Sequence, residues 1–314
     1  MHNSQTAIQV QNLKKKFKEK EVLRGVTFRI DKGTVFCLLG SNGAGKTTTV
    51  KILSTLLKMD EGSAAVNGWD VSRQSDRVRQ CISLTGQFSA VDEILTGREN
   101  LEMAARLCHI KDFKGRAAEL LHDFNLVEAA DKRVSVYSGG MRRRLDIAMS
   151  LAGNPSVLFL DEPTTGLDPQ SRNAMWSMIQ ELKKMGTTIF LTTQYLEEAE
   201  QLADHVAILH DGTIIAEGTV EEIKKLSSRE YITFQFSNLQ LMRRSQELFN
   251  HDITGADEEN LSITIAVHEG MKQVSDLFIA MHKSGIEPAS FSQKKASLED
   301  VFLYLVDNKE GIRS

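Results

Sequence analysis

The chain has 314 residues, of which 41% are hydrophobic and 25% are charged, and its formal net charge is -4. These values are typical of a globular protein with one large domain, or with a large domain and a small one. The acidic balance argues against a protein that binds nucleic acid through a broadly basic surface. No apolar run approaches the roughly 18 residues that a membrane span needs. We therefore expect another chain to supply any membrane spans.

The cysteines and the N-terminus indicate the compartment. Cys37, Cys81 and Cys108 are scattered without the spacing of metal ligands. We expect a reduced chain without disulfides, in which all three lie in the core. The polar start MHNSQTAIQV does not fit a signal peptide. Together these features favour a cytoplasmic protein.

The first predicted elements are strands. Residues 7–13 and 26–30 alternate apolar with polar side chains, as half-buried strands do. Residues 34–40 form a continuous apolar run of strand length, which is typical of a strand covered on both faces. A helix is predicted from Lys46 onward, because apolar residues then recur at helical spacing.

The middle of the chain alternates buried strands with helices. Residues 157–161 and 187–193 read as further buried strands, and residues 205–218 read as a hairpin. Residues 89–137 are mostly helical and interrupt this alternation. We therefore expect an α/β core with a parallel sheet and a helical insertion.

The pattern changes near residue 228. Two segments there alternate with period two, YITFQF and LSITIAV, and helical patterns follow each of them. The order resembles β-α-β-β-α-β, and the amphipathic helix SLEDVFLYLV closes the chain. We predict a large α/β domain over residues 1–227 and a small α+β domain over residues 228–314.

A phosphate-binding loop follows the strand at residues 34–40. The segment GSNGAGKTT matches G-x-x-x-x-G-K-[ST] between a buried strand and a helix. Its glycines let the backbone approach the phosphates, its lysine supplies positive charge, and its first threonine can hold Mg²⁺. The predicted nucleotide ligands are Gly40, Ser41, Asn42, Gly43, Ala44, Gly45, Lys46, Thr47 and Thr48.

Two carboxylates end the strand at residues 157–161. Asp161 is placed to hold Mg²⁺ together with Thr47. Glu162 is one residue further and points differently, so it can polarise a water toward the γ-phosphate. We predict an ATP site with Mg²⁺ at this edge of the sheet.

A second glycine pair opens another helix, in the segment YSGGM. Ser138, Gly139 and Gly140 would offer backbone N–H groups at a helix N-terminus, which suits a second anion. Arg142, Arg143 and Arg144 follow and fan out around the helix. We expect these arginines to form a solvated face or to support a γ-phosphate.

With these motifs in this order, residues 7–225 resemble the ATP-binding subunit of ABC transporters. The finer pattern is similar to the daunorubicin-resistance type of drug and antibiotic exporter, in four segments: GQFSAVDEILTGRENL, YSGGMRRRLDIAMSL, LTTQYLEEAEQLAD and SLEDVFLYL. The resemblance implies a P-loop ABC ATPase fold, with an antiparallel N-terminal β part and the small C-terminal domain.

The resemblance also implies roles for single residues. Two ATPase subunits would meet head to tail, so that residues 138–140 touch the ATP held by the partner. Phe17 stands where the family stacks an aromatic ring on adenine, although a core phenylalanine is the alternative. Gln87 resembles the glutamine that senses Mg²⁺ and the attacking water. Asp168 resembles the aspartate that links the two sites.

This sequence departs from the family most clearly at Gln194. Most members have a histidine there, and a glutamine cannot carry a proton or a charge at pH 7. We therefore predict that Glu162 is the base and that Gln194 only positions phosphate. Tyr137 and Met141 replace a commoner leucine and glutamine, but the phosphate-contacting residues between them are intact.

The resemblance implies an ATP-hydrolysing exporter subunit that powers efflux of a drug, antibiotic or peptide. Its partners would be a separate polytopic permease and a second ATPase subunit, most simply an identical one, at the inner face of the cell membrane. Residues 87–102 are the expected docking surface. The alternatives are an importer subunit, a nearly inactive regulatory subunit, or a soluble ABC ATPase of translation or DNA repair. A single phosphate loop and the lack of a heptad run argue against the last.

Overall fold

The structure is a computed structural model that describes residues 5–86, 90–226, 230–250, 252–267, 271–295 and 297–311. The chain divides into two compact units, Met1–Val220 and Glu221–Ser314. The sequence places a domain boundary slightly later, after residue 227. That each unit is a separate domain stays a prediction.

A six-stranded sheet forms the centre of unit 1. Its order is β10-β9-β3-β8-β7-β6, and neighbouring strands are parallel except for the β9-β10 hairpin. Its strands are β3 (Val35–Leu39), β6 (Ile82–Thr85), β7 (Val157–Asp161), β8 (Thr188–Thr193), β9 (His205–His210) and β10 (Thr213–Gly218). Every residue of β3, β7 and β8 is buried, as the continuous apolar runs predict. The predicted α/β core is therefore confirmed.

A second, antiparallel sheet has the order β2-β1-β4-β5. Its strands are β1 (Thr6–Phe17), β2 (Lys20–Asp31), β4 (Glu61–Val66) and β5 (Trp69–Asp70). The first two are much longer than their alternating segments, because pairing continues through polar residues. Lys14 at the polar end of β1, for example, bonds Glu61 of β4 across 2.6 Å. Cross-strand partners therefore set the strand length here.

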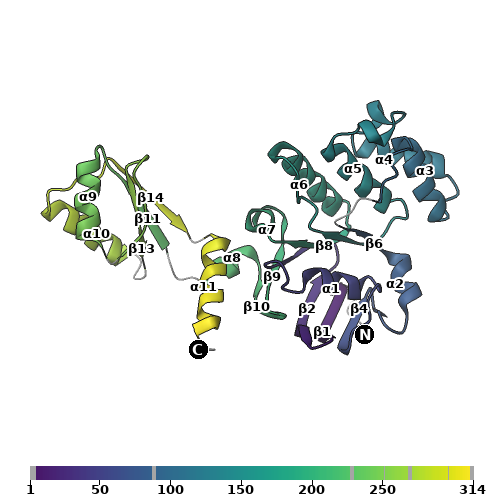
Figure 1. Cartoon of the computed structure of the whole chain (residues 1–314), viewed down its shortest axis with the longest axis horizontal. Coiled ribbons are helices and arrows are strands. Elements are labelled where there is room, and N and C mark those ends of the chain that lie inside the picture. The colour runs from purple at the N-terminus through teal and green to yellow at the C-terminus, as the bar shows by residue number, and fades with distance from the viewer. Residues whose placement is uncertain are drawn as a thin grey trace. The chain divides into compact units, whose positions relative to one another are not determined.

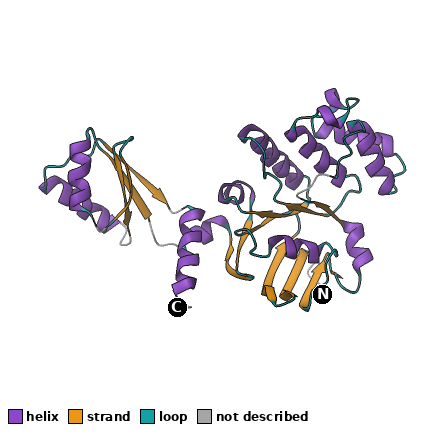
Figure 2. Cartoon of the chain, in the orientation of Figure 1, coloured by secondary structure: helices purple, strands orange, loops and turns teal. Residues whose placement is uncertain are grey.

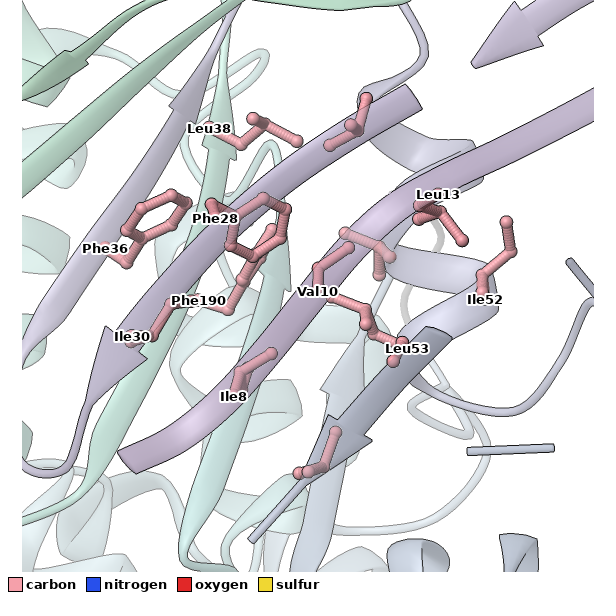
Figure 3. Close-up of a cluster of buried hydrophobic side chains, with 14 of the residues drawn as sticks. Ile8, Val10, Leu13, Phe28, Ile30, Phe36, Leu38, Ile52, Leu53 and Phe190 are labelled. Carbon is pink, nitrogen blue, oxygen red and sulfur yellow. The ribbon is translucent and has the colours of Figure 1, made fainter. Parts of the chain in front are cut away.

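The hydrophobic core of unit 1 fills the space between the two sheets. Four aromatic rings meet there, and the centroids of Phe28 and Phe36 lie 5.0 Å apart in a stacked pair. Phe190 packs against both rings and against Phe159. Figure 3 shows Ile8, Val10 and Leu13 along one strand, facing the same cluster. This core fixes the position of the loop that follows β3.

Helices cover the other side of the six-stranded sheet. They include α3 (Gly97–Leu107), α4 (Phe113–Asp123), α5 (Gly139–Ser150) and α6 (Pro169–Lys184), which lie opposite the antiparallel sheet (Figures 1 and 2). The short turns η1 (Val127–Ala129) and η2 (Val134–Val136) precede α5. Thr96 and Glu99 form a capping box at the start of α3, which the sequence analysis did not identify. The remaining helices of unit 1 are α1 (Lys46–Leu53), α2 (Ser75–Cys81) and α7 (Leu196–Leu202).

Unit 2 contains an antiparallel sheet with the order β12-β13-β11-β14. Its elements are α8 (Val220–Lys224), β11 (Glu230–Gln235), α9 (Leu239–Leu248), β12 (Ile253–Asp257), β13 (Ser262–Val267), α10 (Met271–Lys283), β14 (Ser290–Lys295) and α11 (Leu298–Gly311). From β11 to β14 they follow the β-α-β-β-α-β order that the sequence predicts. Phe234 of β11 is fully buried in the core between this sheet and its helices.

Two expectations about the whole chain can be compared with the structure. Cys37 is buried and Cys81 is half-buried, but Cys108 is exposed just after α3, so its assignment to the core is wrong. Among the described residues, none of the helices combines the length and the apolar character needed to cross a membrane.

Candidate functional site

The phosphate loop joins the end of β3 to the start of α1. A side chain at Gly40 would place its Cβ 2.3 Å from the carbonyl oxygen of Leu209, and one at Gly45 would lie 2.6 Å from Cδ2 of Leu23. Gly43 and Gly45 also have φ values of +82° and +114°, which L side chains rarely adopt. The loop therefore requires glycine at these positions.

Lys46 holds this loop from inside. Its side chain is 4% exposed, and Nζ donates to the carbonyls of Gly40 at 2.7 Å and Ser41 at 3.1 Å. Nζ also lies 3.3 Å from Oε1 of Glu162. Ser41, Asn42 and Gly43 are exposed at the tip, Ala44 is buried, and Thr47 and Thr48 are half-buried in the first turn of α1. The arrangement places a buried cation beneath backbone groups that face outward.

Asp161 ends β7 beside this loop. Its side chain is buried, and Oδ1 accepts hydrogen bonds from Thr192 at 2.5 Å and Thr47 at 3.3 Å. Oxygen atoms are the ligands that Mg²⁺ prefers, and Mg²⁺ commonly uses one or two protein oxygens together with phosphate and water. The described residues contain no cluster of three or more His, Cys, Asp or Glu side chains suited to a metal. The Asp161–Thr47 pair fits a cation that takes its other ligands from a nucleotide.

Glu162 adopts a backbone conformation that is rare for its residue type. Its φ is +51°, and its N–H donates to the carbonyl of Thr192 at 3.1 Å. Such left-handed conformations cost free energy and recur at functional sites. The turn sends the Glu162 carboxylate toward Lys46, while Asp161 faces Thr47. Two adjacent carboxylates thus point at different parts of one site.

The second glycine pair begins α5. Ser138 is the N-cap, and its Oγ accepts the N–H of Met141 at 3.2 Å. A Cβ at Gly140 would lie 2.7 Å from Oγ of Ser171, whereas Gly139 has nothing within 4 Å. Ser171 in turn donates its N–H to Asp168 at 2.9 Å, so the segment of residues 138–140 and Asp168 are neighbours. Hydrogen bonds from the Ser171 hydroxyl and from backbone N–H groups lower the pKa of Asp168.

Among the described residues, no hydrogen bond joins Ser138, Gly139 or Gly140 to the phosphate loop. The chain therefore carries its two glycine-rich segments on separate elements, one before α1 and one before α5.

The chain is similar to known proteins. Residues 23–165 match the protein family described as ABC transporter. The chain is 42% identical to the daunorubicin/doxorubicin resistance ATP-binding protein DrrA of Streptomyces peucetius, over 98% of this chain and 94% of that protein. The chain belongs to the ABC transporter ATP-binding family. Linearmycin resistance ATP-binding protein LnrL of Bacillus subtilis is 33% identical over 95% of this chain and 97% of its own length.

Solved structures agree with this membership. The ATP-binding subunit of an ABC transporter superposes with a TM-score of 0.63 and 30% identity, covering 70% of this chain and 92% of that chain. A dimeric ATP-binding cassette with ADP and Pi bound matches with a TM-score of 0.61 and 25% identity, covering 68% of this chain and 98% of the other. The chain is thus an ATP-binding, ATP-hydrolysing ABC subunit, related to the ATPases of drug and antibiotic resistance exporters.

Three more predicted ABC residues are Phe17, Gln194 and Gln87. Phe17 ends β1 and is 45% exposed, with Nζ of Lys15 5.4 Å from its ring centroid, so the alternative of a core phenylalanine is wrong. Gln194 follows β8 directly and is half-buried, on the same sheet edge as Asp161. Gln87 lies outside the described residues.

The sequence analysis missed the contacts that Thr192 and Arg143 make beside this site. Thr192 of β8 holds both Asp161 and the N–H of Glu162, the latter at 3.2 Å from its Oγ1. Arg143 was expected on a solvated or phosphate-supporting face, but its side chain is only 11% exposed, so a solvated face is wrong for it. The spacing of Arg143 and Asp146, three residues apart on one helix, is the signal that could have found this pair.

Proposed function

We propose that the chain binds MgATP between its phosphate loop and Asp161, and hydrolyses it with Glu162 as the base. Thr47 and Asp161 would hold Mg²⁺, with Gln87 as a further ligand. Glu162 would draw a proton from the attacking water, and its carboxylate, 3.3 Å from Nζ of Lys46, lies next to the phosphate loop. Gln194 would position the γ-phosphate by a hydrogen bond. Phe17 would stack on adenine, and the exposure of its ring at the end of β1 leaves it accessible for this contact.

We further propose that ATP joins two copies of the chain. Ser138, Gly139 and Gly140 offer an exposed helix N-terminus on an element separate from the phosphate loop. In a head-to-tail dimer this segment would cover the ATP of the partner, and Asp168 beside it would contact the partner too. Hydrolysis would remove that link, so binding and release become a mechanical cycle.

The proposed cargo is a hydrophobic drug or antibiotic, exported through a separate polytopic permease. This rests on the names of the relatives, which refer to daunorubicin, doxorubicin and linearmycin resistance. The ATPase would sit peripherally at the inner face of the cell membrane. Residues 87–102 are the proposed docking surface. Within them Ile94 is 76% exposed, and this apolar side chain would become buried in a pocket of the membrane partner.

The observation that carries the ATPase assignment is the convergence of Lys46, Asp161 and Glu162 at one sheet edge. The test uses Glu162→Gln, which should bind ATP without hydrolysing it. The variant is expressed in its native host, the membranes are solubilised with ATP present, and the purified chain is weighed and its companions identified. Two copies together with a polytopic membrane protein are expected.

Two controls make the result specific. Lys46→Ala should lose the ATP-dependent dimer, because the phosphates lose their buried cation. Glu181→Gln should behave as wild type, because Glu181 forms only an exposed pair with Lys184 at 2.7 Å. Recovery of a soluble dimer alone, or of a ribosome or DNA complex, would contradict the export function but not the proposed ATP site.

A further inference from the structure

The guanidinium of Arg143 joins three separate parts of unit 1. Nε donates to the carbonyl of Pro163 at 3.0 Å, and Nη1 donates to the carbonyl of Gly86 at 2.9 Å. Nη1 also lies 3.1 Å from Oδ2 of Asp146, on the same helix. Pro163 is the residue after Glu162, and Gly86 is the residue before Gln87. One side chain of α5, only 11% exposed, therefore contacts the chain next to two predicted ATP-site residues.

Asp146 completes this contact set. Its side chain is 5% exposed, and Oδ1 accepts the N–H of Ala90 at 3.1 Å. Gly86 and Ala90 flank residues 87–89 in the sequence, so the ion pair bonds the chain on both sides of that segment. Figure 1 shows α5 beside β6, the strand that leads to Gly86, and the two elements are in contact.

Burial makes this pair costly to keep. Desolvation lowers the pKa of Arg143 and raises the pKa of Asp146, and in each case the partner opposes the shift. Buried ion pairs often contribute no net stability compared with well-packed apolar side chains. Stability alone therefore does not explain a charged pair at this position. The directed hydrogen bonds to Gly86, Ala90 and Pro163 do explain it, because apolar side chains could not form them.

We propose that Arg143 and Asp146 are positioning residues for hydrolysis, which hold the Glu162 turn and the chain flanking residues 87–89 in place. A guanidinium suits this task because its planar fork can serve several acceptors in fixed directions. Glu162 already occupies an unfavourable φ, so its turn needs outside contacts to keep it there. Arg143 also lies five residues after Ser138, so the helix that would cover the partner's ATP also bonds the residue after the base of its own site.

The test measures ATP hydrolysis by the full-length chain with Arg143→Met and Asp146→Leu combined. Replacing both charges avoids a buried unpaired ion, so the fold should survive. We expect kcat to fall about 10-fold or more, since small misplacements of catalytic groups have effects of this size or larger. KM and ATP affinity should stay within about 2-fold of wild type, because the phosphate loop is untouched.

Two further variants separate positioning from general damage. Arg143→Lys keeps the ion pair but cannot serve all the acceptors, so its kcat should also fall while its thermal stability stays close to wild type. The matched control combines Lys183→Met with Asp204→Leu. Asp204 likewise bonds a cation, Lys183 at 2.5 Å, and a backbone N–H, that of Val35 at 2.9 Å, but at the opposite end of β3 from the phosphate loop. This control should keep its kcat.

The outcomes are distinct. A folded double variant with wild-type kcat overturns the proposal, as does an equal loss of kcat in the Lys183–Asp204 control. If the double variant does not fold, the turnover of Arg143→Lys is the test, and wild-type turnover by that variant overturns the proposal. The inference rests on Glu162 as the base, so Glu162→Gln is measured in parallel. Wild-type turnover by Glu162→Gln overturns both the base assignment and the positioning role of Arg143 and Asp146. An inactive Glu162→Gln together with a fully active double variant overturns only the positioning role.

Discussion

The two units of the molecule differ in what they bury. Unit 1 buries the charged side chains of Lys46, Asp146, Asp161 and Glu198. In the described part of unit 2, the only buried polar residue is Ser245, and the core consists of side chains such as Phe234. Buried charge needs partners and lowers the gain from folding, so a protein keeps it where chemistry requires it.

This difference separates positions that serve chemistry from positions that serve packing. In unit 1 the buried polar side chains include Thr85, Asp161 and Thr193, each of which ends a parallel strand, and open α/β sheets bind their ligands at that edge. In unit 2 the sheet and helices form an apolar core without such a cluster among the described residues. Substitutions in unit 1 should therefore change turnover more than stability, and those in the core of unit 2 should do the reverse.

The largest effect is expected at Glu162. Glu162→Gln removes the proposed base but keeps the shape of the side chain, so kcat should fall by about 10²- to 10⁴-fold, the usual contribution of a general base. ATP affinity and the midpoint of thermal unfolding should change little. Steady-state hydrolysis and an equilibrium ATP titration check this, and near-normal turnover would break the proposed division of labour with Gln194.

The opposite behaviour is expected at Phe234 in unit 2. Phe234→Ala leaves a cavity in the core and should lower the free energy of unfolding of this unit by about 3–5 kcal/mol. ATP affinity should not change. Denaturant unfolding measures the loss, and Phe291→Ala is the control, because that ring is 58% exposed on the neighbouring strand and should have a smaller effect. Equal effects of the two would contradict the packing assignment.

A moderate effect on binding alone is expected at Phe17. Removing one exposed aromatic contact with adenine should weaken ATP by about 0.5–1.5 kcal/mol, or roughly 2- to 10-fold in affinity. Stability should stay constant, since the ring is 45% exposed. Trp69→Ala, which removes another exposed ring at 38%, serves as the control. An unchanged ATP affinity in Phe17→Ala would remove Phe17 from the site.

The smallest effect concerns pH and Glu198. Burial raises the pKa of Glu198 above its ordinary value of 4.5, against smaller opposing effects of neighbouring hydroxyl groups, first that of Thr193. The folded state then holds this proton more tightly than the unfolded state does, so stability is lost as pH rises above about 4.5 toward the raised folded pKa.

Glu198→Gln removes this loss. The free energy of unfolding of the variant should rise relative to wild type as pH increases, with a difference in slope of at most about 1.4 kcal/mol per pH unit. Urea unfolding of both proteins between pH 4 and pH 8 checks the sign. Glu197→Gln is the matched control, because that neighbour is exposed. Parallel curves for wild type and Glu198→Gln would show that Glu198 is charged in the folded state.

The local parts of the site were readable because they depend on neighbours in the sequence. The phosphate loop follows from glycines whose φ values and close contacts allow little else, and β7 was predicted with the bounds observed, Val157–Asp161. The order of elements in unit 2 followed from period-two and helical patterns. The strand lengths in the antiparallel sheet did not follow from such patterns, because Lys14 pairs with Glu61, which is 47 residues away in the sequence.

The sequence by itself determined the family, the phosphate loop, the two carboxylates and the α/β core, because each is written in consecutive residues or in a short period. Only the tertiary structure decided that Thr192 holds Asp161, that Phe17 is exposed and that the Arg143 side chain is largely covered. An arginine looks the same in sequence whether it faces water or a carbonyl. Its burial depends on where other elements place Gly86 and Pro163, and the packing of the whole unit sets that position.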